Sequence, residues 1–291
     1  MATAPPRIFD RRAYARHRER GARRHGDAFL ATEAASGLAE RLAAVNRTFA
    51  RALDLGSRHA AFSLLQPLAK HWTRASLARS DLSAMSGAIA DEEALPFAAQ
   101  SFDLVTSVLS LHAVNDLPGA LIQIRRVLKP DGLFLAALFA GDTLSELRGA
   151  LAAGESEIAG GLSPRVAPFA DVRDLGGLLQ RAGLALPVAD MERTTVRYKD
   201  INRLFADLRT LGETNALSQR DKRGLSRPVL SASLAHYAVN HADPDGRLRA
   251  TFDIVYLTGW APHESQQKPL APGSALASLA DALKKESSSG D

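Results

Sequence analysis

The sequence contains no cysteine among its 291 residues. This absence excludes disulfide bonds, thiolate metal sites and a cysteine nucleophile. The sequence also has no run that reaches the roughly 18 uninterrupted apolar residues of a membrane span, so any contact with a membrane complex must be peripheral. Because the sequence shows no secretory signal, a cytoplasmic location is expected.

Enough apolar material is present for one large folded core. Hydrophobic residues make up 46% of the chain, which at this length favours a single α/β domain with elaborations over two separate domains. The core is expected between about residue 47 and residue 139, together with later strands.

The most informative segment is a strand followed by a glycine turn. Residues 52–56 have the composition of a buried parallel strand that ends at Gly56, and a helix from Ala60 to about Gln66 follows. Strand, glycine and helix in this order are typical of a cofactor-binding loop. Such loops usually contain further glycines that let backbone N–H groups approach the ligand, but here Arg58 and Ala60 stand at those positions. The pattern therefore predicts a cofactor site with weak or altered binding.

Strands and helices alternate after this loop. A short strand over 88–90 ends in Asp91 and Glu92, and apolar strands are expected over 101–109 and 133–139 with a helix between them. Elements expected further along are a helix over 142–157, a helix over 172–182, a strand over 188–198, a helix over 201–212 and a strand over 251–260.

Five motifs in this order resemble the class I S-adenosylmethionine (SAM) dependent methyltransferases: DLG, SDLS, ADEEALPF, SFDLV and LKPDGLF. The resemblance implies an α/β, Rossmann-like, doubly wound sheet of seven strands, with the last strand inserted antiparallel to its neighbours. It also implies SAM as the cofactor. By resemblance Asp54 lies near the methionine amino group, Asp81 binds the ribose and Asp91 contacts the adenine. The full set of cofactor-binding candidates is Asp54, Gly56, Ser57, Asp81, Leu82, Asp91, Glu92 and Leu109.

Further motifs, which cover roughly residues 7 to 275, resemble the methyltransferase-like assembly factors of respiratory complex I. They are IFDR, SLHAVNDLP, GDTLSELR, GLSP, DLGGLLQRAG, GW and HESQ. Members of that family act on a core complex I subunit, and the mitochondrial member is understood to hydroxylate an arginine of it. The resemblance implies a complex I subunit as the protein partner and no nucleic acid. Because IFDR matches the family's mature start, a bacterial cytoplasmic protein is expected, or one on the matrix side of the mitochondrion if the source is eukaryotic.

The chain departs from the family pattern at two places. The family's loop reads D-L-G-C-G-R-G, whereas this chain has Arg58 and Ala60 where two of those glycines stand. Ala113 replaces a tryptophan that usually follows the histidine of the SLHAVNDLP motif. The expected organisation is a basic helical arm over 1–46, a methyltransferase-like domain over 47–265 with its nucleotide-binding core at 47–140 and substrate-side elements at 141–265, and a mostly disordered tail over 266–291.

Three residues in loops at the carboxyl ends of the strands are candidates for catalysis: His112, Asn115 and Asp142. Three roles are open for His112: a general base, a hydrogen-bonding anchor for the substrate, or a capped histidine of the loop. A role in positioning the substrate is favoured over catalysis. No metal site is expected, because the eight histidines show no compact ligand motif. Hydroxylation by a metal would ordinarily need two histidines and a carboxylate.

The N-terminal arm is rich in arginine. Eight arginines lie between residues 7 and 24, and Arg12, Arg16, Arg20 and Arg24 recur every four residues on one helix face. A solvated cap over the cofactor cleft is favoured over a nucleic-acid-binding arm.

Three functions remain open at this stage. The first is a SAM-dependent methyltransferase-like enzyme, or an arginine hydroxylase, that modifies a complex I subunit. The second is a non-catalytic assembly chaperone with a degenerate cofactor loop. The third is a small-molecule methyltransferase of the kind found in biotin or quinone pathways. The fold and the activity need not coincide.

Overall fold

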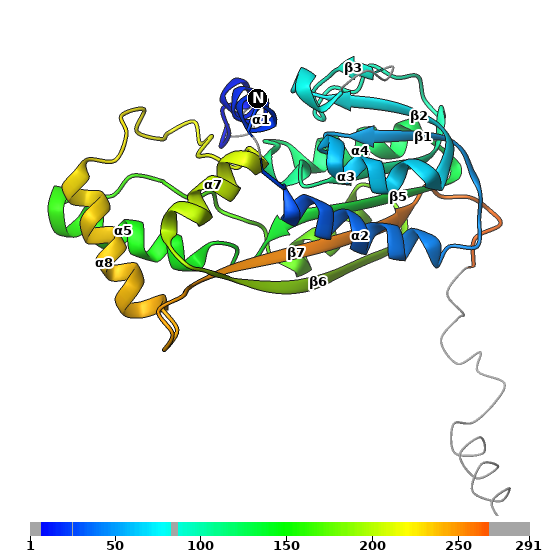
Figure 1. Ribbon diagram of the computed structural model, residues 1–291. Coiled ribbons are helices and arrows are strands. Elements are labelled where there is room, and N and C mark those ends of the chain that lie inside the picture. Colours follow the sequence, from blue (N-terminus) through cyan, green and yellow to red (C-terminus); the bar gives the residue numbers. More distant parts are fainter. Residues whose placement is uncertain (1–6, 25, 83–86, 268–291) are drawn as a thin grey trace, which may run out of the picture.

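A computed structural model describes residues 7–24, 26–82 and 87–267 of the chain (Figure 1). The tail expected to be disordered lies outside the described residues, except at 266–267. Within the described residues no helix is long and apolar enough to cross a membrane.

The centre of the molecule is a seven-stranded sheet with the strand order β3-β2-β1-β4-β5-β7-β6. The pairs from β3 to β5 are parallel, while β7 lies antiparallel between β5 and β6. This confirms the predicted doubly wound sheet and its antiparallel last strand. The strands are β1 (Phe49–Leu55), β2 (Ala69–Ser76), β3 (Gly87–Ile89), β4 (Phe102–Val108), β5 (Leu128–Ala140), β6 (Ala185–Tyr198) and β7 (Leu248–Trp260).

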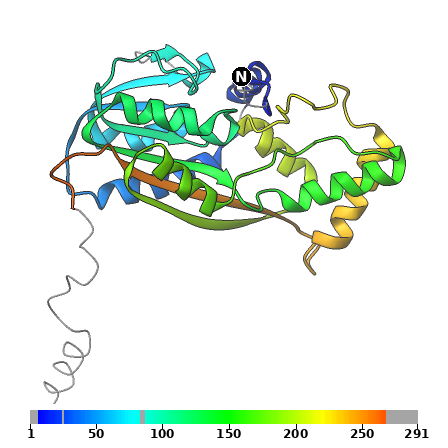
Figure 2. The same cartoon turned by 180° about the vertical axis from the view of Figure 1, so that it is seen from behind.

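Helices cover both faces of the sheet (Figures 1 and 2). One apolar cluster joins α2 and α3 to the sheet, and α4 and α6 pack in the cluster on the opposite face. The helices are α1 (Arg11–Ala22), α2 (Phe29–Ala43), α3 (His59–Leu65), α4 (Leu117–Val127), α5 (Ser145–Ala159), α6 (Val172–Arg181), α7 (Ile201–Leu211) and α8 (Arg227–His241), with short 3₁₀ turns η1 (Gln66–Leu68), η2 (Arg79–Asp81) and η3 (Leu111–Ala113).

Several elements differ from the sequence-based expectation. The bounds of α2 and β2 were not predicted, and β5 begins at Leu128 rather than at residue 133. Helix α5 begins at Ser145 rather than at Asp142, because Leu144 has a left-handed conformation with φ of 55° that breaks the helix before it. Helix α8 was not predicted at all. It packs against α5, where Gly154 has no side chain and lets the backbone of Ser233 approach closely.

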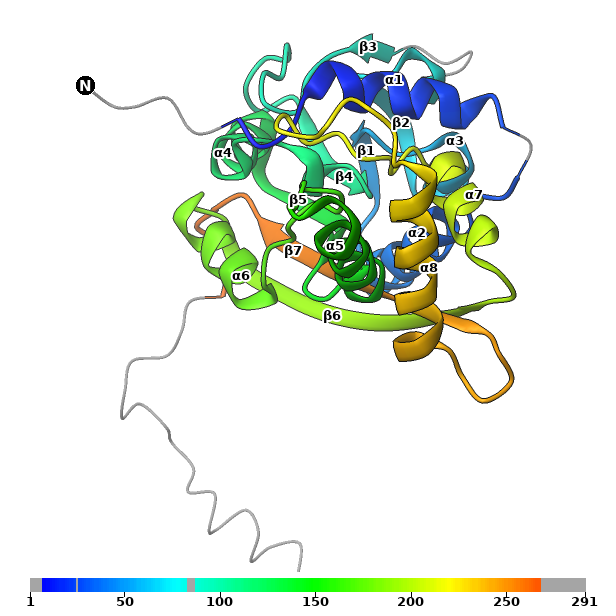
Figure 3. The same cartoon turned by 90° about the vertical axis from the view of Figure 1, so that its left-hand side faces the viewer.

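Helix α1 lies across the end of the sheet, beside α7 and η2 (Figure 3). Asp10 caps the helix, because its side chain accepts a hydrogen bond from the backbone N–H of Ala13. Arg12, Arg16 and Arg20, which recur every four residues, are exposed on one face of this helix. The opposite face of the helix carries Arg11 and Arg18, whose side chains point toward the carboxyl ends of the parallel strands.

Candidate functional site

The residues expected to bind a cofactor lie at the carboxyl ends of the parallel strands. Asp54 is the next-to-last residue of β1, Gly56 follows that strand, and Asp81 lies in η2 after β2. Asp91 and Glu92 follow β3, and Leu109 follows β4. The carboxyl ends of parallel strands share one edge of a sheet, so these residues frame one cleft. Leu82 is buried at the end of η2, and Ser57 is buried beneath the glycine turn.

The guanidinium of Arg18, from helix α1, lies inside this cleft. Its Nε donates to Asp81 Oδ2 at 2.8 Å and one terminal nitrogen donates to the carbonyl of Leu109 at 3.2 Å. The other terminal nitrogen donates to the carbonyl of Gly56. Arg18 and Asp81 are both almost fully buried. One side chain of the arm thus joins the ends of β1, β2 and β4.

Asp54 is paired with a second arginine, Arg74 of β2. Arg74 Nε donates to Asp54 Oδ2 at 3.1 Å, and a terminal nitrogen donates to the carbonyl of Ser57 at 2.6 Å. Ser57 in turn donates from its hydroxyl to Asp54. Burial raises the pKa of Asp54 above its usual value, although the nearby positive charge of Arg74 opposes that rise. Asp54 is therefore held by protein groups rather than left open to a ligand.

The two acids after β3 are paired with a third arginine, Arg11 of α1. Arg11 donates to Asp91 Oδ1 at 3.0 Å and also to Glu92. Glu92 accepts a further hydrogen bond from the hydroxyl of Ser110. Each of the carboxylates that the sequence assigned to the cofactor thus has a guanidinium partner from this chain.

The cleft in this arrangement does not fit SAM. Gly56 has φ of +68°, and a Cβ placed on it would lie 2.6 Å from Ser110 Cβ and 2.8 Å from Glu92 Oε1. A side chain at this position would clash with Ser110 and Glu92, so only a glycine fits here. The carboxylates that would bind ribose and adenine are already satisfied, so no chemical step can be assigned through SAM here.

Arg58 does not block the glycine turn in the way its position in the loop suggested. Its terminal nitrogens donate to the carbonyls of Arg18 at 2.9 Å and Thr210 at 2.7 Å. The side chain therefore ties the loop to α1 and α7. Burial lowers the pKa of Arg58, with the positive charge of Arg18 adding to the effect. Ala60 is exposed at the start of α3.

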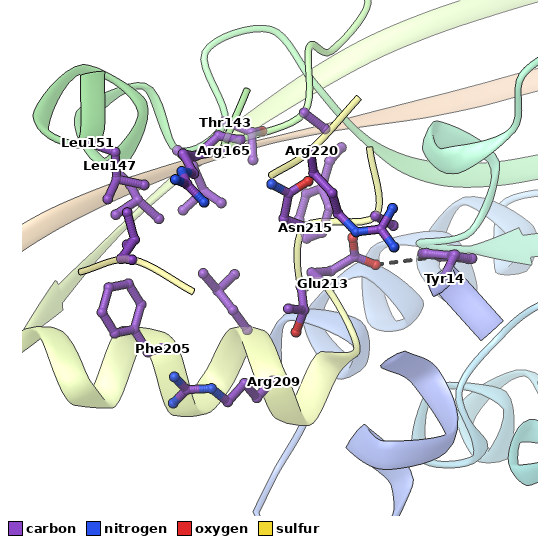
Figure 4. A pocket seen from close by; sticks show the side chains of 18 of the residues that line it. Tyr14, Thr143, Leu147, Leu151, Arg165, Phe205, Arg209, Glu213, Asn215 and Arg220 are labelled. Carbon is purple, nitrogen blue, oxygen red and sulfur yellow. Dashed lines mark hydrogen bonds between the residues drawn. The ribbon is translucent and has the colours of Figure 1, made fainter. Parts of the chain in front are cut away.

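A cavity of about 750 Å³ adjoins the cleft (Figure 4). Apolar and aromatic side chains form most of its wall, and segments far apart in the sequence supply them. Tyr14 of α1 separates the cavity from the cleft and lies within 3.5 Å of both Glu213 Oε1 and the carbonyl of Leu109. Other wall residues include Phe139, Leu147, Leu151, Phe169 and Phe205.

His112 and Glu213 form a pair in the wall of this cavity. His112 Nε2 lies 3.1 Å from Glu213 Oε2, and the buried Nδ1 of His112 has no hydrogen-bond partner among the residues that the structure describes. The rings of Phe139 and Phe169 lie 5.1 and 6.0 Å from the imidazole. Burial opposes ionisation of Glu213, but His112 and the guanidinium groups of Arg18 and Arg58 outweigh it and lower the pKa of Glu213.

The two other catalytic candidates lie elsewhere. The side-chain amide of Asn115 bonds both backbone groups of Phe9, with Oδ1 accepting at 2.7 Å and Nδ2 donating at 3.2 Å. It anchors the N-terminal segment. Asp142 is largely exposed and pairs with Arg193 at 2.8 Å, which also holds the buried Asp253. The structure thus places only His112 of the three in the cavity wall.

Sequence reasoning missed the residues that fill the cleft and complete the cavity, namely Arg11, Tyr14, Arg18, Arg74 and Glu213. Arg11, Tyr14 and Arg18 recur on one helix face at spacings of three and four, a signal that was present in the arm. Glu213 carries no such signal. Within the described ranges no group of three or more His, Asp or Glu residues could hold a metal ion.

Comparisons with known proteins agree with this architecture. A family model described as "Methyltransferase domain" matches residues 21–187. "Arginine-hydroxylase NDUFAF5, mitochondrial" of Danio rerio is 41% identical over 265 residues, covering 88% of this chain and 82% of that protein. The human protein of the same name is 42% identical over 262 residues, covering 87% and 76%.

Two further similarities are more distant. "Malonyl-[acyl-carrier protein] O-methyltransferase" of Halorhodospira halophila is 36% identical over 270 residues, covering 87% of this chain and 88% of that protein. The crystal structure of the YcgJ protein of Bacillus subtilis superposes with a TM-score of 0.55 at 14% identity, over 78% of this chain and 99% of that one. This structural similarity shows the fold alone.

Proposed function

Because this chain belongs to the class I SAM-dependent methyltransferase superfamily, and within it to the family of the arginine-hydroxylase NDUFAF5 proteins, we propose that it modifies an arginine side chain of a protein partner. The proposed partner is a subunit of respiratory complex I. The proposed cofactor is SAM, which the cleft would admit only after the arginines of α1 have released Asp81, Asp91 and Glu92. The proposed location is the bacterial cytoplasm, or the mitochondrial matrix side if the source is eukaryotic.

The observation that carries the proposal is the Glu213 carboxylate in an aromatic cavity. One of its oxygens accepts a hydrogen bond from His112 Nε2. Within the described part of the chain, the other has only a 3.5 Å contact with the hydroxyl of Tyr14. A carboxylate with spare acceptor capacity is the group that binds a planar guanidinium, which can donate to it twice. The lowered pKa keeps Glu213 charged at neutral pH.

The aromatic wall supports the same substrate class. The faces of Phe139 and Phe169 offer stacking surfaces for a guanidinium, which is weakly hydrated and stacks on aromatic rings. A volume of about 750 Å³ admits an arginine side chain together with its backbone. His112, beside both rings, would hold the orientation of Glu213 through its Nε2.

The mouth of the cavity is basic. Arg209, Lys222 and Arg223 line the cavity and are exposed, and Asp221 offsets one of these charges by pairing with Arg223 at 3.1 Å. Positive charge at this place would repel a substrate arginine unless acidic residues flank it in the partner. We therefore expect the target arginine to lie in an acidic segment.

Peptide mass analysis of complex I subunits, from cells with and without the gene, tests the proposal. Addition of one oxygen or one methyl group to an arginine should depend on the gene and be lost with Glu213→Gln. A matched control exists, because Glu157 forms a similar pair with His236 at 2.8 Å on the surface. Glu157→Gln should leave the modification in place. An unmodified arginine in cells that carry the wild-type gene would contradict the proposal.

A second function has an observation in its favour. The filled cofactor cleft is what a non-catalytic assembly chaperone would have, since such a protein needs the fold and a partner surface but no cofactor. In that case deletion of the gene would impair complex I assembly while every subunit kept its mass. A small-molecule methyltransferase, the third possibility, would affect neither assembly nor subunit mass.

A further inference from the structure

Helix α1 carries arginines of two kinds. Arg12, Arg16 and Arg20 face solvent, whereas Arg11 and Arg18 are on the opposite face about two helical turns apart. Arg11 and Arg18 enter the cleft at the ends of the parallel strands, with Tyr14 between them. The helix therefore delivers two positive charges to a place where the fold normally receives a ligand.

Arg18 is bound at this place as a ligand would be. Besides Asp81, Gly56 and Leu109, its guanidinium contacts the hydroxyl of Tyr14 at 3.1 Å. All three of its nitrogen atoms thus donate hydrogen bonds, and Asp81 is further held by the hydroxyl of Ser76 at 2.9 Å. A charge buried this deeply is stable only because its partners are complete.

We propose that helix α1 is a plug, in which Arg18 occupies the nucleotide site and SAM enters only after α1 has moved away. The plug competes with SAM for the same groups, Asp81 and the Gly56 turn. This inference concerns cofactor entry and stands whether or not the partner's arginine is the substrate.

Outside the cleft, helix α1 packs mainly on α7 and η2. The contacts there are polar: His17 Nδ1 lies 3.0 Å from the carbonyl of Thr214, Glu19 accepts from the N–H of Ser80 at 3.1 Å, and Arg58 donates to the carbonyl of Arg18 at 2.9 Å. For the helix to leave, Arg11 and Arg18 would have to release the carboxylates that follow β3 and β2. Tyr14 leaves with the helix, so opening the cleft would also open the wall between the cleft and the substrate cavity.

Calorimetry with S-adenosylhomocysteine (SAH), the unreactive product, measures the competition directly. Arg18→Gln should bind SAH at least about tenfold more tightly than wild type, because the apparent affinity of wild type is its intrinsic affinity multiplied by the small fraction of molecules in which α1 is open. Arg16→Gln, on the exposed face of the same helix, should match wild type. Equal affinity for Arg18→Gln and wild type, or no SAH binding by either, would overturn the proposal.

Hydrogen exchange on the unaltered protein gives a test that needs no folded variant. Saturating SAH should increase exchange over residues 11–22, because a plug is displaced by its competitor. A helix that merely closes over bound cofactor would become more protected, and that result would also overturn the proposal. If the wild-type protein does not bind SAH at the highest concentration reached, the calorimetry on Arg18→Gln becomes the test, and binding by that variant supports the proposal. Neither readout depends on subunit mass, so failure here is distinct from failure of the proposed activity.

Discussion

Arg18 Nε and Asp81 Oδ2 lie 2.8 Å apart, and each residue is only 1% exposed. A buried ion pair contributes little net stability, because taking two charges out of water costs about as much as their attraction returns. Removing one partner is a different matter, because the remaining charge is left buried and unpaired. The pair therefore makes the closed cleft strongly dependent on both residues.

Arg18→Leu should accordingly lower the free energy of unfolding by about 3–5 kcal/mol. Urea unfolding at neutral pH measures the change. Adding Asp81→Asn to this variant should restore part of the loss, since the unpaired charge is then gone. Arg12→Leu, on the exposed face of α1, should change stability by no more than about 0.5 kcal/mol. Additive effects of Arg18→Leu and Asp81→Asn would argue against an energetic coupling.

Gly56→Ala and Gly149→Ala should have opposite effects. At Gly56 the left-handed backbone costs about 1–2 kcal/mol, and the crowding by Ser110 and Glu92 adds about 1–3 kcal/mol of overpacking. Gly149 lies inside α5 with no atom within 4 Å of an added Cβ, so alanine there should stabilise the helix by up to about 1 kcal/mol. Thermal unfolding of both variants, compared with wild type, measures the two changes in stability. Equal tolerance of both substitutions would mean that the glycine turn is more open than described.

The lowered pKa of Glu213 predicts a pH dependence of stability. A carboxyl whose native pKa is lowered stabilises the folded state fully above its unfolded pKa, near 4.5, and this contribution is lost as the pH falls through the native value. The stability difference between wild type and Glu213→Gln should therefore shrink as the pH falls below about 4.5. Urea unfolding of the two proteins as a function of pH tests this. A difference that grows on acidification would reverse the assignment.

Arg58→Gly and Ala60→Gly separate two explanations of the altered loop. If the missing glycines excluded the cofactor by their bulk, both substitutions should tighten SAH binding. The structure instead has Arg58 holding the carbonyls of Arg18 and Thr210, so Arg58→Gly should loosen α1 and tighten binding, while Ala60→Gly should have little effect. Calorimetry with SAH on the single variants distinguishes them. A larger gain for Ala60→Gly would favour the steric explanation.

The exposed face of α1 should contribute to partner capture. Reversing Arg12, Arg16 and Arg20 to glutamate should slow association with an acidic partner, and the effect should be larger at low than at high salt. Folding and SAH affinity should stay near wild type, because these side chains are exposed. The association rate with the purified complex I subunit, measured at two ionic strengths, tests this expectation. Unchanged association at low salt would remove this face from the interface.

The sheet could be predicted from the sequence because its signals are local. Apolar runs such as 101–109, bounded by turn residues, gave β4, and the order of the motifs gave the topology. The contents of the cleft could not be predicted in the same way. Arg18 and Asp81 are 63 residues apart in the chain, and nothing near either residue indicates that they meet. The carboxylates were assigned to a ligand, while the guanidinium groups that hold them came from the arm and from β2.

The position of β7 has a consequence for how the chain is made. Although it is the last strand in the sequence, β7 lies between β5 and β6 and pairs with both. On the ribosome, β6 emerges before it has a neighbour in the sheet, and the buried edge of β5 stays unpaired until residues 248–260 have been synthesised. Such an edge is a site for pairing with other chains. The nascent protein therefore passes through a period in which the strands β1 to β5 exist but the place of β7 beside β5 is empty, and a chain that stopped before Leu248 would keep that exposed edge permanently.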